Sequence, residues 1–204
     1  MSSSTNITTT LVDLPFPELE TKRLQLRLAP PASAERMIQF LRENTEHFSP
    51  WDPTPPKDFY DIEYWKNRLD DAFNAFREGR ALRLKLYQKD DSKEEIIGTC
   101  SFDQIQRGPF QSCYLGYKIA AKYEGEGMMH EALEAAIHYV FNELKLHRVI
   151  ANYMPHNVRS GHLLNRLGFR VEGTAKDYLF INGAWRDHVM TSLTNPHFKE
   201  FRWY

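Results

Sequence analysis

The stretch Lys122–Met129, which reads KYEGEGMM, decides how the rest of the chain is interpreted. It directly follows Tyr114–Ile119, a run typical of a strand, and it opens a helical pattern that extends to about Leu144. Gly125 and Gly127 let the backbone approach a ligand closely, and the first N–H groups of a helix have no partner within the helix. The segment therefore predicts an anion site suited to a pyrophosphate, and a plain glycine turn into a helix fits it equally well.

Several other kinds of site are excluded by the motifs. His130 occupies the third glycine position of the dinucleotide fingerprint G-x-G-x-x-G, and the Gly-Lys-Ser/Thr of a Walker loop is absent. The eight histidines contain no H-E-x-x-H pair, so we expect no metal site. Cys100 and Cys113 lie in strand-like runs, where a buried and unreactive thiol is the usual state.

The composition is that of a globular domain with no wholesale affinity for nucleic acid. The 204 residues are 42% hydrophobic, which is enough for a core, and the formal net charge is −1. Met1–Thr10 has no basic residue and no apolar run, and no later segment is long enough to span a bilayer. We expect a cytoplasmic protein without DNA or membrane partners. It would consist of a flexible tail (1–19), a single domain (20–196) and an aromatic C-terminal tail (197–204).

The remaining patterns predict about seven strands and about four helices in one mixed α/β domain. Strands are expected at 22–28, 81–88, 95–105, 111–119, 148–154, 170–181 and 185–193. Helices are expected at 33–46, 59–78, 125–144 and 158–167. Phe48–Asp58 holds four prolines and predicts an irregular loop, and Asn182-Gly183 predicts a hairpin turn.

Taken with the glycine segment, Asn152–Phe169 (NYMPHNVRSGHLLNRLGF) resembles the GCN5-related N-acetyltransferase (GNAT) family. In that family a Q/R-x-x-G-x-G/A loop holds the acetyl-CoA pyrophosphate, and an Asn in an N-x-x-[AS] turn contacts the pantetheine arm. The segments PWDP, CYLGY and AKDYLFINGAWRDHV extend the resemblance to RimJ-type ribosomal-protein alanine N-acetyltransferases, from about Glu20 to Pro196. The resemblance implies a twisted, mostly antiparallel sheet and acetyl-CoA as cosubstrate. It also implies that the acceptor is the N-terminal alanine of the fifth small-subunit ribosomal protein, with contact to a ribosome or an assembly intermediate.

The resemblance also assigns the cofactor-binding residues. The strand before the glycine loop splays from strand 148–154 and offers an N–H near Leu115 or Gly116 to the thioester carbonyl. Lys122 stands where the family has Gln or Arg, and it keeps a donor side chain. The complete expected set is Leu115, Gly116, Tyr117, Lys122, Tyr123, Glu124, Gly125, Glu126, Gly127, Met128, Met129, Asn157 and Ser160.

The usual acid and base of the family are missing. Tyr114 stands where many relatives have Glu, and Leu164 where many have Tyr. Ser160 resembles a serine proposed to protonate the leaving thiolate in related ribosomal-protein acetyltransferases, and a capping or packing role fits it equally well. An α-amine, with an ordinary pKa near 8, needs only a weak base. A water held by Asp103, Glu172 or a backbone carbonyl would suffice, and Glu172 is our choice among the side chains.

Acceptor selection is expected from the loop around Trp51 and the hairpin Tyr178–His188. Asp52, Asp58 and Asp177 would receive a basic ribosomal tail, although loop carboxylates are more often merely solvated. Two alternatives stay open, the second of them because the usual Glu and Tyr are absent. One is an acetyltransferase for a small amine such as an aminoglycoside, a polyamine or an amino acid. The other is a non-catalytic acyl-CoA-binding or ribosome-associated module.

Overall fold

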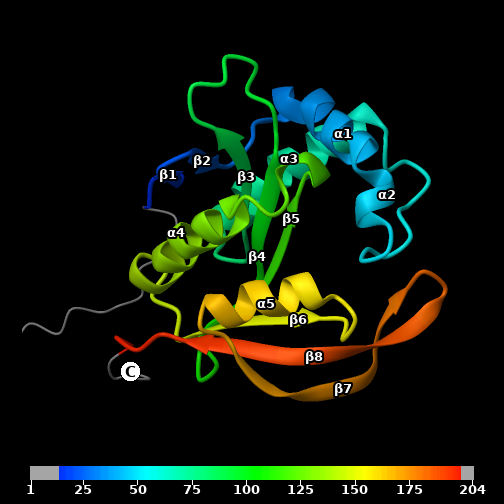
Figure 1. Cartoon of the computed structure of the whole chain (residues 1–204). Helices are drawn as coiled ribbons and strands as arrows, with labels where there is room; N and C mark the ends of the chain where they lie inside the picture. Colours follow the sequence, from blue (N-terminus) through cyan, green and yellow to red (C-terminus); the bar gives the residue numbers. More distant parts are fainter. Residues whose placement is uncertain (1–13, 199–204) are drawn as a thin grey trace, which may run out of the picture.

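Alternating leucines in the central strands build the sheet that carries the site. Leu82, Leu84 and Leu86 share one face of β3 (Leu82–Gln88) and are fully buried, as period-two patterning predicts. The computed structural model describes residues 14–198. It forms an eight-stranded sheet flanked by helices (Figure 1).

The strands follow the predicted runs closely, and the helices are shorter than predicted. The strands are β1 (Glu18–Glu20), β2 (Leu24–Arg27), β3, β4 (Gly98–Gln106), β5 (Ser112–Ile119), β6 (Arg148–Tyr153), β7 (Arg170–Ile181) and β8 (Ala184–Thr194). The α-helices are α1 (Ala34–Glu43), α2 (Thr45–Phe48), α3 (Ile62–Arg77), α4 (Met128–Asn142) and α5 (Val158–Arg166). Two 3-10 turns, η2 (Pro31–Ser33) and η3 (Ala121–Tyr123), precede α1 and α4.

One pair of neighbouring strands differs from all others in the sheet. The strand order is β1-β2-β3-β4-β5-β6-β8-β7, and only β5 and β6 pair in parallel. They pair at three positions, of which the last joins Tyr114 to Ile150, and then separate. In Figure 1, β6, β8 and β7 consequently turn away from β3, β4 and β5. The predicted splay between these two strands is confirmed.

The predicted mixed, mostly antiparallel sheet is confirmed, with eight strands rather than about seven. The additional strand is β1, which reads Glu-Leu-Glu and is too short and too charged to give a strand pattern. The predicted flexible tail 1–19 is wrong for residues 14–19, because Phe16 packs its ring 4.9 Å from that of Phe73. Residues 1–13 lie outside the described part of the chain. Of the predicted tail 197–204, only His197 and Phe198 are described, and the Phe198 ring lies 5.1 Å from that of His147.

The helix predicted over 33–46 breaks at Asn44. The Asn44 amide nitrogen donates to the Phe40 carbonyl at 2.8 Å, and its side-chain oxygen accepts from the Ala121 N–H at 2.9 Å. Asparagine side chains compete in this way with the helical backbone. The break starts α2 in a new direction and brings His47 and Phe48 to the cavity described below.

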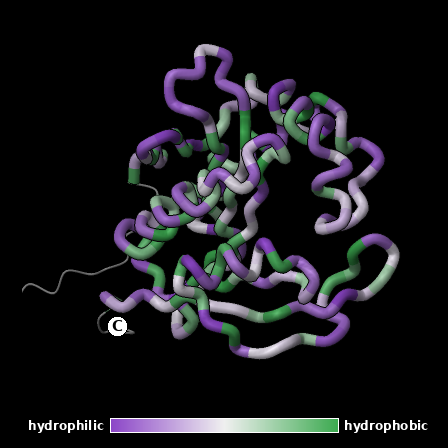
Figure 2. Tube along the Cα trace, viewed as in Figure 1, coloured by the Kyte–Doolittle hydropathy of each residue, from purple (hydrophilic) through white to green (hydrophobic). Residues whose placement is uncertain are grey.

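Apolar helix faces cover the sheet. The predicted buried face of α4 is confirmed by Met129, Leu133, Ile137 and Val140, all of which are buried. In Figure 2 the hydrophobic segments gather in the strands and on α4, while the connecting loops are largely hydrophilic. Figure 1 shows α5 lying along β6, so α5 flanks the strand that leaves β5.

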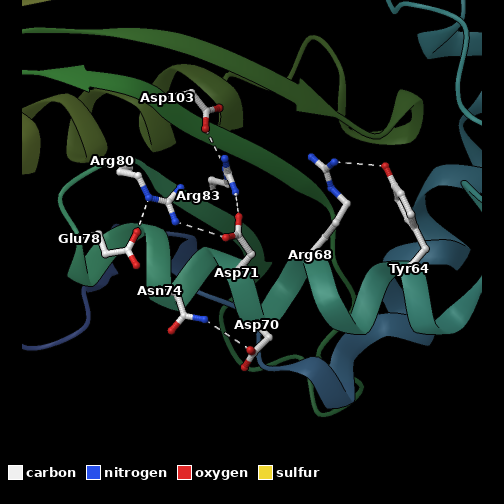
Figure 3. A network of polar contacts seen from close by, with 9 residues as sticks. All are labelled: Tyr64, Arg68, Asp70, Asp71, Asn74, Glu78, Arg80, Arg83 and Asp103. Atoms are coloured by element: carbon white, nitrogen blue, oxygen red, sulfur yellow. Dashed lines mark hydrogen bonds and ion pairs between the residues drawn. The ribbon is translucent and has the colours of Figure 1, made fainter.

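Helix α3 is fixed to the sheet by a network of charges (Figure 3). Its N-terminus is capped by Asp61, whose carboxylate accepts from the N–H of Glu63 at 2.7 Å. Arg83 on β3 bridges Asp71 of α3 and Asp103 of β4, with both distances 2.8 Å. Asp103, considered above as a holder of a catalytic water, is therefore engaged in this network rather than in the cavity.

One cation near this network is buried at a cost to stability. Lys85 on β3 is 7% exposed, and burial lowers the pKa of its amine to about 8. Below pH 8 the folded protein must keep this charge in an apolar environment. As the pH rises from 8 towards the ordinary value of 10.5, the unfolded chain holds the proton more tightly than the folded one, so the penalty disappears.

Lys85→Met is therefore expected to increase the free energy of unfolding at pH 7, by about 3 kcal/mol at most for a shift of this size. The increase should shrink between pH 8 and pH 10, because the wild-type protein loses its penalty there. Denaturant unfolding of both proteins at pH 7 and pH 9.5 measures this. An equal difference at the two pH values would contradict the role of the buried charge.

Candidate functional site

The sheet opens into a large cavity where β5 and β6 separate. Its volume is about 1150 Å³, somewhat larger than most small-molecule sites. Four parts of the chain line it: the α2 region, the end of β5 with the following glycine loop, the end of β6 with α5, and His188 of β8. Past Tyr114, the β6 side of β5 has no strand partner, so backbone groups there are available to a ligand.

The glycine loop delivers an uncapped helix N-terminus to this cavity. Gly125 and Gly127 have φ values of +78° and +77°, a conformation that favours glycine. Gly127 is the N-cap of α4, and no side chain caps the helix there. Unpaired N–H groups and the positive end of the helix dipole therefore lie at the cavity wall, where a pyrophosphate fits. The residues present suit the predicted acetyl-CoA.

Side chains far away in the sequence hold the loop in place. Arg23 donates to the Glu126 carbonyl at 3.0 Å and forms an ion pair with Glu131 of α4 at 2.7 Å. Glu124 is paired with His47 of α2 and with Arg159 of α5. The loop thus has a fixed shape before any ligand arrives, and one of its ion pairs uses an exposed arginine next to the predicted phosphate position.

Twelve of the thirteen expected cofactor-binding residues line the cavity, and Lys122 does not. Its ammonium group pairs instead with Glu95 at 2.6 Å, and that hydrogen bond raises the pKa of Lys122. The sequence position of the family's Gln or Arg is thus occupied by a side chain that points elsewhere. The backbone and α4 are left to bind the phosphates.

Ser160 and Tyr117 form a hydroxyl pair across the cavity. Their oxygens lie 2.6 Å apart, joining α5 to the unpaired part of β5. The N-terminus of α5 is capped by Asn157, which accepts from the Ser160 N–H at 3.2 Å, so the Ser160 hydroxyl is not needed as a cap. Burial raises the pKa of Tyr117 to about 12, so this phenol keeps its proton at neutral pH. The pair can therefore deliver a proton into the cavity.

The structure does not bring Glu172 to this place. Its carboxylate accepts hydrogen bonds from Ser192, at 2.7 Å, and from Arg148, at the beginning of β6 and away from the cavity. These two hydrogen bonds lower the pKa of Glu172, which makes it a weaker base. The geometry therefore gives no support to Glu172 as the base. Its carboxylate is already engaged by an ion pair with β6 and by a hydrogen bond from β8.

Some of the residues expected to select the acceptor lie at the cavity, and others do not. Trp51 and Asp52 line the cavity, with Asp52 paired to Lys118 of β5. Asp58 and Asp177 are exposed and do not line it. The tip of the β7–β8 hairpin closes the gap to the proline-rich loop, where the Asn182 side chain donates to the Ser49 carbonyl at 2.5 Å.

Two polar residues line the cavity from β6 and β8: Asn152, which the sequence did not single out, and His188, which it named only as the end of the acceptor hairpin. Asn152 donates to the Tyr178 hydroxyl at 3.2 Å, and the His188 ring lies 5.3 Å from that of Tyr178. Each is a polar residue within a strand, and His188 is buried although the residues beside it on β8 are half-buried. A polar residue at an inward-facing position of a strand was the signal that could have indicated them.

Two features together are those of an acyl-CoA-dependent transferase: the gap between the parallel strands β5 and β6, and the uncapped N-terminus of α4 beside it. The model of the acetyltransferase (GNAT) domain family matches residues 23–170, and the chain belongs to this family. Acetyl-CoA is the cosubstrate of its enzymes, as the sequence predicts.

Within this family, three proteins of known name are similar to the chain over most of its length. A ribosomal protein uS5-alanine N-acetyltransferase of Escherichia coli is 45% identical over 184 residues, 90% of this chain and 94% of its own. A crystal structure of a ribosomal-protein-S5-alanine acetyltransferase from Vibrio fischeri is 35% identical, with a TM-score of 0.85 over 90% of this chain and 100% of its own. RimJ of Mycobacterium smegmatis, in complex with CoA-disulfide, is 27% identical with a TM-score of 0.79, over 88% and 86%.

Residues 14–198 lack two kinds of feature. No helix in this range is long and apolar enough to cross a membrane. Within the same range, no three His, Cys, Asp or Glu side chains are grouped so that they could hold a metal ion. Burial raises the pKa of the Cys100 and Cys113 thiols to about 12, so neither is a nucleophile at neutral pH.

Gly127→Ala is expected to weaken acetyl-CoA binding about tenfold, because a left-handed conformation costs an alanine roughly 1–2 kcal/mol. Relaxing that strain would turn the first N–H groups of α4 away from the phosphates. Isothermal titration with acetyl-CoA measures the change. Lys122→Ala is the matched control and should bind within about twofold of wild type. A large loss in Lys122→Ala, or none in Gly127→Ala, would contradict the assignment.

Proposed function

We propose that this acetyltransferase modifies the α-amine of the N-terminal alanine of ribosomal protein uS5. The observation that carries the proposal is the 45% identity to the Escherichia coli enzyme named for that reaction, over 90% of the chain. The cavity is compatible with a peptide end, because it continues from the β5–β6 gap to the loop of Trp51 and to His188. A substrate of this kind implies that the enzyme works in the cytoplasm, without DNA or membrane partners.

The reaction is a direct attack of the free amine on the acetyl thioester that acetyl-CoA supplies when bound. The unpaired backbone of β5 near Leu115 and Gly116 is placed to donate an N–H to the thioester oxygen. Such a donor stabilises the charge that develops in the transition state. Ser160 passes its proton to the leaving sulfur and takes one in turn from the hydroxyl of Tyr117, and the phenolate so formed recovers a proton from water because its pKa is about 12.

Contact with a larger ribosomal particle is part of the proposal. Phe180 and Trp185 are 54% and 60% exposed at the tip of the β7–β8 hairpin, with ring centroids 5.7 Å apart. Figure 2 shows apolar segments at this tip. Exposed aromatic side chains beside a substrate cavity are typical of a surface that receives a protein partner. A ribosome or an assembly intermediate that presents the uS5 terminus would supply that partner.

Thiol release from acetyl-CoA tests the acceptor. A peptide with the N-terminal sequence of uS5 and a free alanine is expected to be turned over. The same peptide with a blocked N-terminus and a free lysine should not be, because a lysine amine, with a pKa near 10.4, is almost fully protonated at neutral pH. Spermidine serves as the small-amine control. Turnover of spermidine but of neither peptide would contradict the uS5 acceptor and favour a small amine instead. Tight acetyl-CoA binding with no turnover of any amine would favour a binding module.

Ser160→Ala is expected to lower kcat about 100-fold with little change in the KM for acetyl-CoA, since an acid acts on the leaving group rather than on binding. Tyr117→Phe should lower kcat as well. The double variant should be no worse than about threefold below Ser160→Ala, because the two hydroxyls act as one unit. Steady-state kinetics of the three variants check this. Losses that multiply in the double variant would show that the hydroxyls act separately.

A further inference from the structure

The acceptor side of the cavity contains a buried polar atom with no partner. Within the described residues, the side-chain oxygen of Asn152 accepts no hydrogen bond, while its nitrogen donates to the Tyr178 hydroxyl at 3.2 Å. An unsatisfied buried acceptor is destabilising unless a ligand supplies the missing hydrogen bond. Because Asn152 lines the cavity, the ligand group that fits here is a hydrogen-bond donor.

His188 offers a second acceptor in the same place. Its Nδ1 lies 3.0 Å from the Arg186 carbonyl oxygen, which can only accept, so Nδ1 carries the hydrogen. In the neutral ring, Nε2 then holds the lone pair, and among the described residues the hydrogen bond to Arg186 engages only the other ring nitrogen. The residue is 4% exposed and lines the cavity. Its tautomer is thus set for taking up a proton at Nε2.

Strand register places Asn152 and His188 on the same face of the β6–β8 pair. Asn152 pairs with Met190, and His188 is two residues from Met190, so their side chains share a face of β6 and β8. Tyr153 belongs to the opposite face, where its ring fills the space next to Gly161 of α5. Since α5 also carries Ser160, the proton donor and the two acceptor atoms approach the gap between β5 and β6 from opposite sides.

An ammonium group has three N–H donors and no acceptor, and thus matches these two atoms. We propose that Asn152 holds the substrate α-amine through its side-chain oxygen and that His188 takes the proton that frees the amine for attack. One N–H bond of the ammonium group breaks, the proton binds Nε2 of His188, and the electron pair stays on the amine nitrogen. The imidazolium afterwards releases the proton to water. This inference rests on the proposed function of the same site.

The charged and titratable groups around His188 are few. The Tyr178 ring packs on it from β7, and Asp187 precedes it on β8, where Lys176 neutralises that carboxylate. The ion pair of Asp52 and Lys118 contributes no net charge to the cavity wall. Glu124 is paired and Glu126 belongs to the glycine loop, so neither carboxylate lies on the strands that carry the acceptor atoms. His156 packs on Trp51, and His47, His130 and His162 line the cavity from helices. Among the residues of β6 and β8 that line the cavity, His188 is therefore the one with an imidazole nitrogen free to accept a proton.

The test is the pH dependence of kcat/KM for the free-alanine peptide in His188→Asn. Asparagine can still donate to the Arg186 carbonyl but has no atom that accepts the proton. An α-amine with a pKa near 8 is only about 3% neutral at pH 6.5 and mostly neutral at pH 9. Without a base, the variant can acetylate only the fraction of the substrate whose amine is already neutral. We expect kcat/KM on the order of tenfold below wild type at pH 6.5 and close to wild type at pH 9.

Two further variants separate proton transfer from structure. His138→Asn, the same change at an exposed residue of α4 outside the cavity, should match wild type at both pH values. Asn152→Ala should raise the KM for the peptide equally at both, because it removes a hydrogen bond and not a base. His188→Gln replaces His188→Asn if thermal unfolding shows that the latter does not fold.

The outcomes distinguish this inference from the proposed function. A loss in the His188 variant that is equal at pH 6.5 and pH 9, or no loss, overturns the inference while the acceptor stands. Absence of turnover by the wild-type protein with the alanine peptide overturns the proposed function, and the inference with it. A loss confined to low pH, with His138→Asn unaffected, supports both.

Discussion

The separation of β5 from β6 after three paired residues is the constraint on which the site depends. A sheet normally pairs every backbone group of its inner strands, and an interior gap leaves such groups unpaired. Here the gap is stable because other parts hold the two strands apart: α5 lies along β6, and the hydroxyls of Ser160 and Tyr117 meet across the opening. The unpaired backbone is therefore a preformed ligand site rather than a defect of the sheet.

The two ends of the cavity beside this gap differ in their polar groups. At the end expected to take the phosphates, backbone N–H groups and a helix terminus line the wall, and the Glu124 carboxylate there is paired with Arg159 and His47. The opposite end presents hydrogen-bond acceptors, as the proposed amine requires. This polarity matches an anionic cosubstrate on one side and a cationic acceptor on the other. The groups concerned lie on α2, α4, α5, β6 and β8, so the fold rather than any local motif brings them together.

Much of this arrangement was predictable from the sequence. Period-two leucines, the Asn182-Gly183 turn and the glycines before α4 report local geometry, which is why the strands, the hairpin and the glycine turn into α4 were correctly predicted. The direction of the Lys122 side chain could not be predicted, because its partner Glu95 lies 27 positions away and no pattern joins them. The position of Glu172 away from the cavity could not be predicted either, since strand register and not residue type decides which end of β6 it faces. Asn152 was not singled out, and His188 only as the end of the hairpin, because their proposed roles depend on which atoms remain without partners.

The hydrogen bond between Asn182 and Ser49 has a consequence for the independence of the two ends of the cavity. It joins the hairpin tip to the proline-rich loop, and each bonded residue directly follows a buried one, Ile181 and Phe48. The glycine loop takes no part in this contact, because it is held by Arg23, His47 and Arg159. A change of length in the hairpin tip would therefore alter the far end of the cavity while leaving the first turn of α4 in place.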